Sequence, residues 1–285
     1  MMERIYYCFA MLLLPLAVMA EHLDAQQLMS LTPNPDVRAT YDPVTRVYQG
    51  GGIGILVYDG VNAIDVLGPY QVFTTAGLKP LLISASKNNE GTFKKNILFN
   101  NDLSVTVDKT IADINDLEAL IVPGGVFGTI MIAKDADVIS WIKAIDKKTI
   151  VTASVCTGSW ILGAAGLLQG KHATSNWYRA EELLLHFGAI PHPDQRYLYD
   201  GKLWTASGVT AGFDMALDMV QKLFTHDLND GKDYTQSVML DLQYDPKPPI
   251  AGGAISNTEP KVFDALQSKY DLYNLSHLVK QIPIQ

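Results

Sequence analysis

Short apolar runs alternate along this chain with longer stretches in which apolar residues recur at helical spacing. GIGILVY at 52–58, LEALIV at 117–122 and TIVTASV at 149–155 are typical of strands buried on both faces. Helices are expected at 62–77, 135–148, 157–168, 177–188, 210–224 and 233–244. Strands that alternate with helices of this length predict an α/β fold with a mostly parallel central sheet between helical layers.

Two segments depart from the alternation and are expected to form hairpins or short strands. RYLYDGKLWTAS at 196–207 predicts a hairpin with Asp200 and Gly201 at its turn, because Asp-Gly is a strong hairpin signal. Residues 98–110 are typical of extended or hairpin structure.

The ends of the chain differ from its middle. Residues 1–20 have the layout of a secretory signal peptide: Arg4, an apolar stretch, and small residues before a cut after Ala20. The alternative is an uncleaved anchor or an incorrect start site. We expect an N-terminal arm at 21–50, an α/β domain at 51–225, and a C-terminal extension at 226–285 that packs on the core or on a dimer partner. The protein is then exported, to the periplasm or outside the cell.

The charge excludes some partners. The formal net charge is −8, and Lys and Arg never cluster beyond a pair, so nucleic acid and anionic membranes are not expected partners. We also expect no stable membrane insertion once the signal is cleaved. The six histidines include no i, i+4 pair and no Cys/His cluster, so the sequence predicts no metal site.

One cysteine lies at a junction between a strand and a helix. Signal cleavage would remove Cys8 and leave Cys156, in SVCTGS, as the only thiol. A cysteine at a helix N-terminus is expected to have a lowered pKa, and a sharp turn would expose it as a nucleophile. The alternative is a small buried residue without chemistry, which is the commoner fate of a free cysteine.

Two further groups lie near the expected ends of strands, where ligands bind in parallel sheets. Gly124 and Gly125, in a Pro-Gly-Gly turn, let the backbone approach an anion closely, although an isolated turn of this kind is more often structural. Asp65 is a carboxylate among apolar helical residues, where burial would raise its pKa and suit it to proton transfer. Its alternative role is to complement the charge of the helix N-terminus.

Several blocks together resemble the ThiJ/PfpI family, part of the class I glutamine amidotransferase-like superfamily. They are AIDVLGPYQVF, LIVPGG, TASVCTGSWILGAAGLLQGKHAT, DGKLWTASGVTAGFDMALDMV and LQYDPKPPIAG, which span about residues 52–252. The resemblance implies a flavodoxin-like three-layer sandwich, usually as a homodimer, with the cysteine on a strained elbow. Order and spacing are most similar to isonitrile hydratases and to the amidase-like sensor domains of AraC-type regulators.

The resemblance also implies roles for individual residues. Cys156 is the expected nucleophile and Asp65 the acid/base carboxylate, assisted by Thr157. Backbone donors are expected from Thr157 and from the Gly124–Gly125 turn. Asn176 and Gly208 are expected to line the pocket.

Asn176 departs from the family pattern, because relatives commonly carry a histidine there. Without that histidine a Cys–His dyad is absent, which weighs against an amidase or protease. The favoured hypothesis is a cofactor-independent hydratase that adds water to a small isonitrile through a thioimidate on Cys156. The alternatives are a non-enzymatic ligand sensor and another thiol-dependent activity of the fold, such as a glyoxalase, stress protein or amidase.

Overall fold

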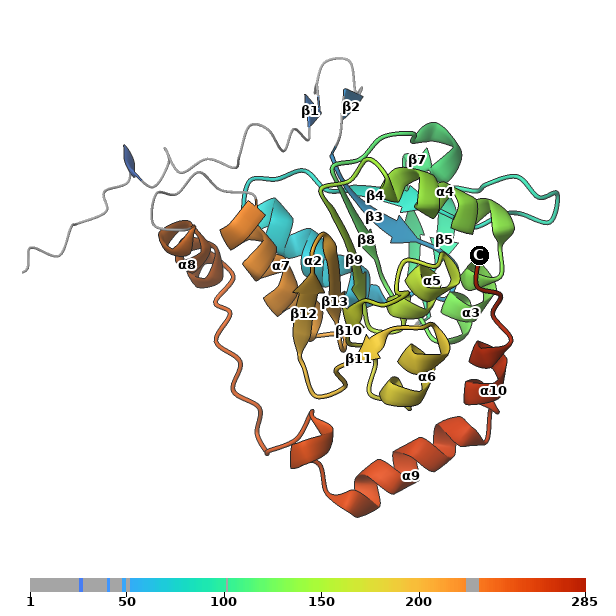
Figure 1. Ribbon diagram of the computed structural model, residues 1–285. Coiled ribbons are helices and arrows are strands. Elements are labelled where there is room, and N and C mark those ends of the chain that lie inside the picture. Colours follow the sequence, from blue (N-terminus) through green and yellow to red (C-terminus); the bar gives the residue numbers. More distant parts are fainter. Residues whose placement is uncertain (1–25, 28–39, 42–47, 50–51, 101, 224–230) are drawn as a thin grey trace, which may run out of the picture.

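A mostly parallel seven-stranded sheet forms the centre of the molecule, as the computed structural model shows (Figure 1). The structure describes residues 26–27, 40–41, 48–49, 52–100, 102–223 and 231–285. Across the sheet the strands are β12 (Tyr197–Asp200), β13 (Leu203–Ala206), β9 (Val151–Val155), β8 (Ala119–Val122), β3 (Ile53–Val57), β4 (Leu81–Ser84) and β7 (Lys109–Thr110). Only the edge strand β12 runs antiparallel to its neighbour.

Helices cover both faces of this sheet. On one face α2 (Ala63–Thr75) packs against α7 (Ala211–Leu223), and α8 (Lys232–Asp241) packs on both. The other face carries α3 (Phe127–Ala133), α4 (Ala136–Asp146), α5 (Gly158–Ala164) and α6 (Ala180–His186) (Figure 1). Strands β3, β8 and β9 are buried along their whole length, as expected for continuous apolar runs between two helical layers. The flavodoxin-like sandwich expected from the sequence is confirmed.

Smaller paired strands lie outside the main sheet. β5 (Asn96–Leu98) and β6 (Ser104–Thr106) form an antiparallel hairpin, whereas β10 (His172–Ala173) pairs in parallel with β11 (Ile190–Pro191). β1 (Thr40–Tyr41) pairs with β2 (Tyr48–Gln49). A 3-10 turn, η1 (Ile111–Asp113), precedes β8.

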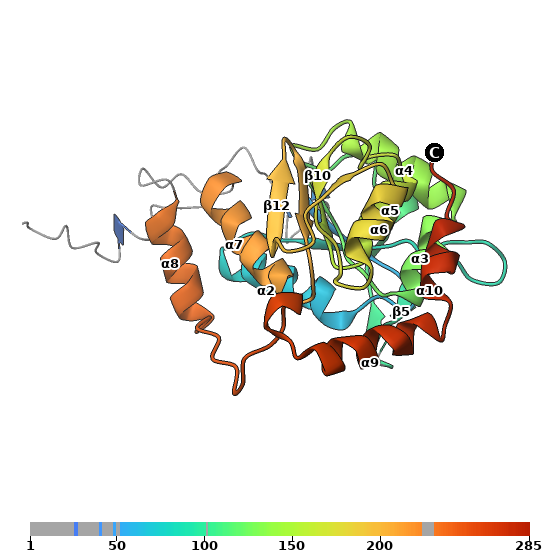
Figure 2. The same ribbon diagram turned by 60° about the horizontal axis from the view of Figure 1, so that its bottom comes forward.

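The C-terminal residues form a strap around one end of the molecule. After α8 the chain passes through the 3-10 turn η2 (Ile255–Asn257), α9 (Pro260–Asp271) and α10 (Leu275–Lys280). Figure 2 shows α9 lying across the front once the bottom of the molecule is brought forward. The backbone N–H of the last residue, Gln285, donates to the carbonyl of Ala164 at the end of α5.

Several element limits differ from those expected. The helix expected from Trp177 begins only at Ala180, because Arg179 has a left-handed backbone conformation (φ 45°). The predicted hairpin is present, but Asp200 pairs with Leu203, so Gly201 and the residue after it form the turn. Helices α3, α9 and α10 were not expected. The expected domain boundaries at 50/51 and 225/226 border or lie within residues outside the described part of the chain, as do the signal peptide and most of the arm.

Candidate functional site

Cys156 occupies a strained turn between β9 and α5. Its φ is +59°, in the left-handed region that costs a non-glycine residue about 1–2 kcal/mol. Its backbone N–H donates to the carbonyl of Ala206 at the end of β13, 2.9 Å away. A Cβ on Gly158 would lie 1.9 Å from the carbonyl oxygen of Val122, so only glycine allows α5 to begin this close to β8. The sharp elbow expected from the sequence is therefore present, but the expectation that it exposes the thiol is wrong, because Cys156 is buried.

Asp65 lies fully buried in the first turn of α2. Asn62 caps this helix by accepting hydrogen bonds from the backbone of Ile64 and Asp65. One carboxyl oxygen, Oδ2, accepts a hydrogen bond of 2.9 Å from the N–H of Gly124. The other, Oδ1, is buried and has no hydrogen-bond partner within the described structure.

Asp65 and Cys156 perturb each other's ionisation. Burial raises the pKa of Asp65 from 3.8 to about 7, and interactions with Gly124 and with the thiol offset this only partly. Burial also raises the pKa of the Cys156 thiol, and the charge of Asp65 raises it further. The Asn176 amide and the Thr157 backbone N–H act in the opposite direction but do not outweigh burial. The prediction of a lowered thiol pKa is therefore wrong.

The Thr157 side chain joins the elbow to the Pro-Gly-Gly turn. Its Oγ1 accepts hydrogen bonds from the backbone N–H groups of Gly125 (3.0 Å) and Val126 (3.1 Å). The N–H of Gly124 is likewise directed at Asp65. Both glycine N–H groups thus donate hydrogen bonds within the protein. Donation from them to a substrate stays a prediction, and it would require these internal bonds to break.

Asn176 contacts the sulfur directly. Its Nδ2 donates to Cys156 Sγ at 3.3 Å, while its Oδ1 accepts from the backbone N–H of Tyr178 at 3.1 Å. The second bond fixes the amide so that its donor end faces the thiol. Gly208 follows β13 and lines a pocket next to this loop, together with Ser175. The structure therefore brings together all the residues predicted around Cys156, with Gly208 in a neighbouring pocket.

A buried hydroxyl network beneath the site was not predicted. Thr129 Oγ1 lies 2.9 Å from Thr157 Oγ1 and 3.1 Å from the hydroxyl of Tyr58, which donates to the carbonyl of Pro123 at 2.7 Å. These bonds hold the Pro-Gly-Gly turn and Thr157 in one arrangement. The signal available in the sequence was the tyrosine hydroxyl at the end of an otherwise apolar strand.

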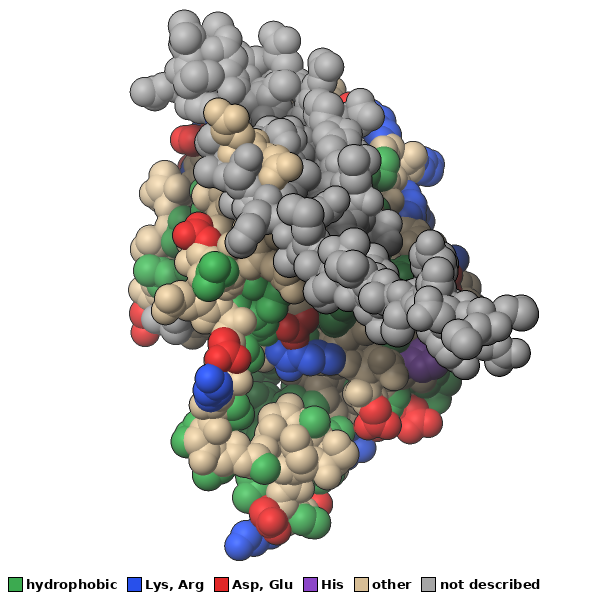
Figure 3. All heavy atoms as spheres, turned by 90° about the vertical axis from the view of Figure 1, so that its left-hand side faces the viewer, with side chains coloured by type: hydrophobic (Ala, Val, Ile, Leu, Met, Phe, Trp, Pro, Cys, Tyr) green, Lys and Arg blue, Asp and Glu red, His purple; other side chains and the backbone are tan. Residues whose placement is uncertain are grey.

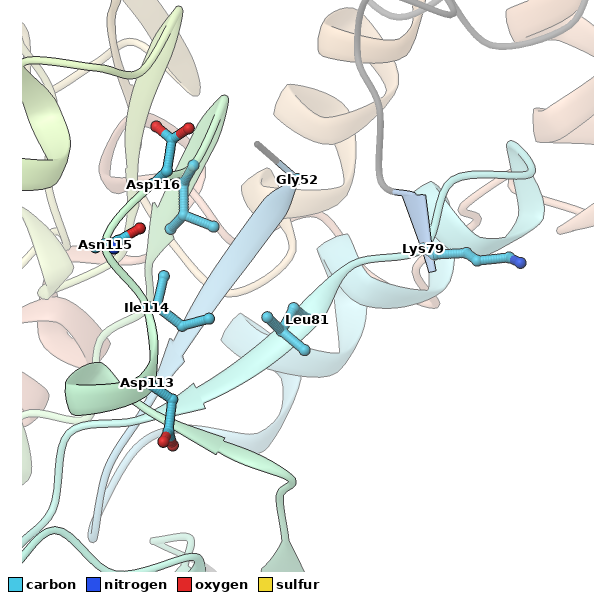
Figure 4. Close-up of a pocket in the computed structure, with 8 residues that line it drawn as sticks. Gly52, Lys79, Leu81, Asp113, Ile114, Asn115 and Asp116 are labelled. Atoms are coloured by element: carbon cyan, nitrogen blue, oxygen red, sulfur yellow. The ribbon is translucent and has the colours of Figure 1, made fainter. Parts of the chain in front are cut away.

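A second pocket lies at the opposite edge of the sheet (Figure 4). It has a volume of about 200 Å³ and is lined by residues at or just before the first residues of β3, β4 and β8, including Gly52 and Leu81. In Figure 4 the Lys79 side chain points away from Asp113 and Asp116. Ligands of parallel sheets bind beyond the carboxyl ends of the strands, so the Cys156 edge is the stronger candidate.

Among the described residues, no group of three or more His, Cys, Asp or Glu side chains could hold a metal ion. None of the helices within the described ranges is long and apolar enough to cross a membrane.

The elbow cysteine at the carboxyl edge of a parallel sheet, next to a buried carboxylate, places the chain among flavodoxin-like α/β proteins with a cysteine-centred site. Comparison with known families makes this specific. The model of the DJ-1/PfpI family matches residues 52–222, and the chain belongs to this family, as its resemblance to ThiJ/PfpI proteins implied.

Individual relatives agree with this assignment. The chain is 35% identical to isonitrile hydratase of Pseudomonas putida over 217 residues, which cover 76% of this chain and 89% of that protein. The crystal structure of a ThiJ/PfpI family protein from Pseudomonas syringae superposes with a TM-score of 0.72 at 29% identity, covering 87% of this chain and 96% of that one. The HTH-type transcriptional regulator CdhR of Pseudomonas aeruginosa is 27% identical over 124 residues, 44% of this chain and 36% of that protein.

Proposed function

We propose that the protein is a cysteine-dependent hydratase that converts a small isonitrile into an N-substituted formamide. The observation that carries this proposal is the buried pair of Asp65 and Cys156, which favours retaining a proton near neutral pH. An isonitrile needs a nucleophile and a proton at the same carbon atom, which a thiol and a carboxyl group side by side can supply. The similarity to isonitrile hydratase over most of the chain supports the same reaction.

The first step forms a covalent thioimidate. Sγ of Cys156 bonds to the terminal carbon of the isonitrile as its proton passes to Asp65, and Asp65 delivers a proton to that carbon. The product of this step is an S–CH=N–R group on the enzyme, and Asp65 is left with the charge it had before. The Asn176 amide stabilises negative charge on the sulfur during the attack.

The second step consumes one water molecule. Water adds to the thioimidate carbon while Asp65 accepts one proton from it and passes that proton to the nitrogen. The tetrahedral intermediate then expels the sulfur, which takes up the proton of the hydroxyl group as the carbonyl forms, and releases the formamide R–NH–CHO. The net reaction is the addition of one water molecule.

The accessibility of the sulfur also favours this substrate. Cys156 is only 5% exposed, so the reacting group must be narrow. An isonitrile group is linear and its terminal carbon carries no substituent. An amide carbonyl carbon carries substituents on both sides and is therefore wider.

Kinetics of three variants test this proposal with p-nitrophenyl isonitrile as substrate. Cys156→Ala should abolish formamide formation. Asp65→Asn should lower kcat by about 10²- to 10⁴-fold, as expected for a lost general acid. Asn176→Ala removes one hydrogen bond to sulfur and should cost about tenfold or less. A larger loss for Asn176→Ala than for Asp65→Asn would refute this route for the proton.

Intact-mass measurement separates the hydratase from the sensor alternative. In the wild type, stopped by acid during turnover, a mass increase equal to one isonitrile molecule is expected from the thioimidate on Cys156. The similarity to CdhR favours the sensor, in which a ligand binds without turnover. Tight binding of isonitriles by the wild type, with neither formamide nor a covalent adduct, would support the sensor instead.

We also propose that two copies of the chain form a homodimer. Figure 3 views the molecule from the left-hand side of Figure 1 and shows hydrophobic side chains in the lower part of this face. Large apolar side chains are exposed on and after α8 and α9, among them Leu240, Val262, Leu266 and Leu272. Exposed apolar groups of this kind are typical of association surfaces. Light scattering should give twice the chain mass; a monomer at micromolar concentration would contradict the dimer.

A further inference from the structure

The loop that carries Asn176 has no regular secondary structure of its own. It spans residues 174–179, between the end of β10 and the start of α6, and its last residue, Arg179, has a left-handed backbone conformation. The core holds the beginning of this loop, where the N–H of Thr174 donates to Thr205 Oγ1 at 2.9 Å. The rest of the loop lies outside any sheet or helix, so its conformation depends on contacts with other parts of the chain.

The strap supplies contacts to the second half of this loop. The ring of Trp177 packs edge-on against Phe263 and Tyr270 of α9, with centroid distances of 5.9 and 5.6 Å. The hydroxyl of Tyr178 donates to Oδ1 of Asp271, the last residue of α9, at 2.7 Å. Although it belongs to a loop, Tyr178 is only 1% exposed. The end of the loop is therefore packed against the strap.

The carboxylate of Asp271 holds two consecutive residues of the loop. In addition to the Tyr178 hydroxyl, it binds the guanidinium of Arg179, with Nε donating to Oδ1 at 3.0 Å and Nη2 to Oδ2 at 2.9 Å. A bidentate pair of this kind fixes direction as well as distance. Glu182 of α6 accepts from Arg179 Nη1 at 3.0 Å. That bond stays within the core, whereas the Asp271 bonds tie the loop to the strap.

Tyr178 also orients the Asn176 amide. Its backbone N–H donates to Asn176 Oδ1 at 3.1 Å, which leaves Nδ2 directed at Cys156 Sγ, 3.3 Å away. Tyr178 thus binds Asp271 through its side chain and Asn176 through its backbone. A continuous path of hydrogen bonds therefore leads from the strap to the sulfur.

We propose that Asp271 is a positioning residue: by holding the end of the loop, it keeps the Asn176 amide directed at Sγ of Cys156. Where it concerns turnover, this inference rests on the proposed function. The hydrogen bond at the sulfur can also be tested without an isonitrile, because alkylation of the thiol needs no turnover.

Loss of the Asp271 carboxylate alone should not release the strap. Leu275 and Val279 of α10 are buried against the core, and Lys280 pairs with Glu182 of α6 at 2.6 Å. These contacts remain when Asp271 is replaced. The effect of the replacement is therefore expected at the loop, with the strap still docked.

A double-mutant cycle with p-nitrophenyl isonitrile tests the proposal. Asp271→Ala should lower kcat about two- to tenfold, by no more than Asn176→Ala does, and should change KM by less than about twofold. Because Asp271 acts through Asn176, adding Asp271→Ala to Asn176→Ala should lower kcat no further. Asp271→Glu keeps the carboxylate and should restore kcat to within about twofold of the wild type. Equal losses in both backgrounds would overturn the proposal.

Alkylation of Cys156 by iodoacetamide at pH 7.5 separates this inference from the proposed reaction. Asp271→Ala should react about two- to tenfold more slowly than the wild type, because a misdirected amide no longer stabilises negative charge on the sulfur. In the Asn176→Ala background the same replacement should change nothing further. Asp271→Asn, which keeps the shape of the side chain, should show a smaller change of the same sign.

Lys280→Met is the control, since it removes a different ion pair between the strap and α6 and should keep the wild-type rate of alkylation. If the alkylation cycle holds but no isonitrile is turned over, the proposed reaction fails alone. An unchanged rate in Asp271→Ala would overturn the positioning role. A faster rate would show that the strap only covers the sulfur, and would overturn it as well.

Discussion

Replacement of Asp65 by asparagine should stabilise the folded protein more strongly as the pH rises. The wild-type carboxyl is fully buried, and burial raises its pKa from 3.8 to about 7. In the unfolded chain the same group loses its proton near pH 4. Between about pH 4 and pH 7 the Asp65 carboxyl carries a proton in the folded state that it has lost in the unfolded state. The wild-type free energy of unfolding therefore falls as the pH rises through this range. The asparagine variant has no proton to lose at this position.

The structure sets the magnitude of this effect. At about 1.4 kcal/mol for each pH unit, a rise from 3.8 to about 7 corresponds to about 4 kcal/mol. The stability of Asp65→Asn relative to wild type should therefore increase by about 3 to 4 kcal/mol between pH 4 and pH 8, and level off above the folded pKa. The amide oxygen of asparagine can still accept the hydrogen bond of Gly124, which keeps the comparison close to one of charge alone.

Urea unfolding at several pH values, with reductant present, measures this difference. Asp113→Asn is the control with the opposite sign, because the backbone N–H of Thr110 lowers the pKa of Asp113. The Asp113 carboxylate stabilises the folded wild type above the pKa that this group has in the unfolded chain, and this stabilisation is lost as the pH falls. The free energy of unfolding of Asp113→Asn should therefore approach that of the wild type in acid. A difference between Asp65→Asn and wild type that stays within about 1 kcal/mol from pH 4 to 8 would refute the raised pKa.

Three further expectations follow from the site and the sequence. Because burial and the charge of Asp65 raise the pKa of Cys156, iodoacetamide at pH 7.5 should alkylate the wild type more slowly than Asp65→Asn; the reverse order would contradict the coupling. Thr157→Val removes the acceptor for one buried and one partly buried backbone N–H group and should cost about 2–4 kcal/mol of stability in urea unfolding. The exposed Thr106→Val should cost under about 1 kcal/mol, and equal losses would argue against a structural role for the Thr157 hydroxyl. We propose that the protein is exported with a mature N-terminus near Glu21, which N-terminal sequencing from the native host tests; an uncleaved chain in the cytosol would refute it.

The sequence was sufficient to predict the sheet because its signals are local. Apolar runs such as 52–58 and 149–155 became β3 and β9, and the helices between them bring their carboxyl ends to one edge. The elbow at Cys156 was predictable for the same reason, since a strand and a helix on either side leave space only for a tight turn. The family resemblance then directed attention to Asp65, which composition and spacing alone left ambiguous.

Other features depend on contacts between distant segments and carry little local signal. Arginine is not a residue type that indicates a left-handed backbone conformation. The late start of α6 after Arg179 was therefore not predictable. The strap was expected only as an extension, because the contacts that place α9 join Trp177 to Phe263 and Arg179 to Asp271, about ninety residues apart. The hydroxyl network of Tyr58 and Thr129 is likewise assembled from separate strands and helices.

The thiol pKa shows why the position of a residue on an element does not settle its chemistry. A helix N-terminus stabilises a nearby anion by about 0.3–1 kcal/mol, or about 2 kcal/mol in favourable buried geometries. Removing an ion from water costs several kcal/mol, and at Cys156 the negative charge of Asp65 adds to that cost. The sulfur therefore rests as a thiol, and its proton is available to a substrate that can accept both the sulfur and the proton. A low thiolate fraction also slows oxidation, so the arrangement that the proposed hydration requires would also protect the cysteine when no substrate is bound.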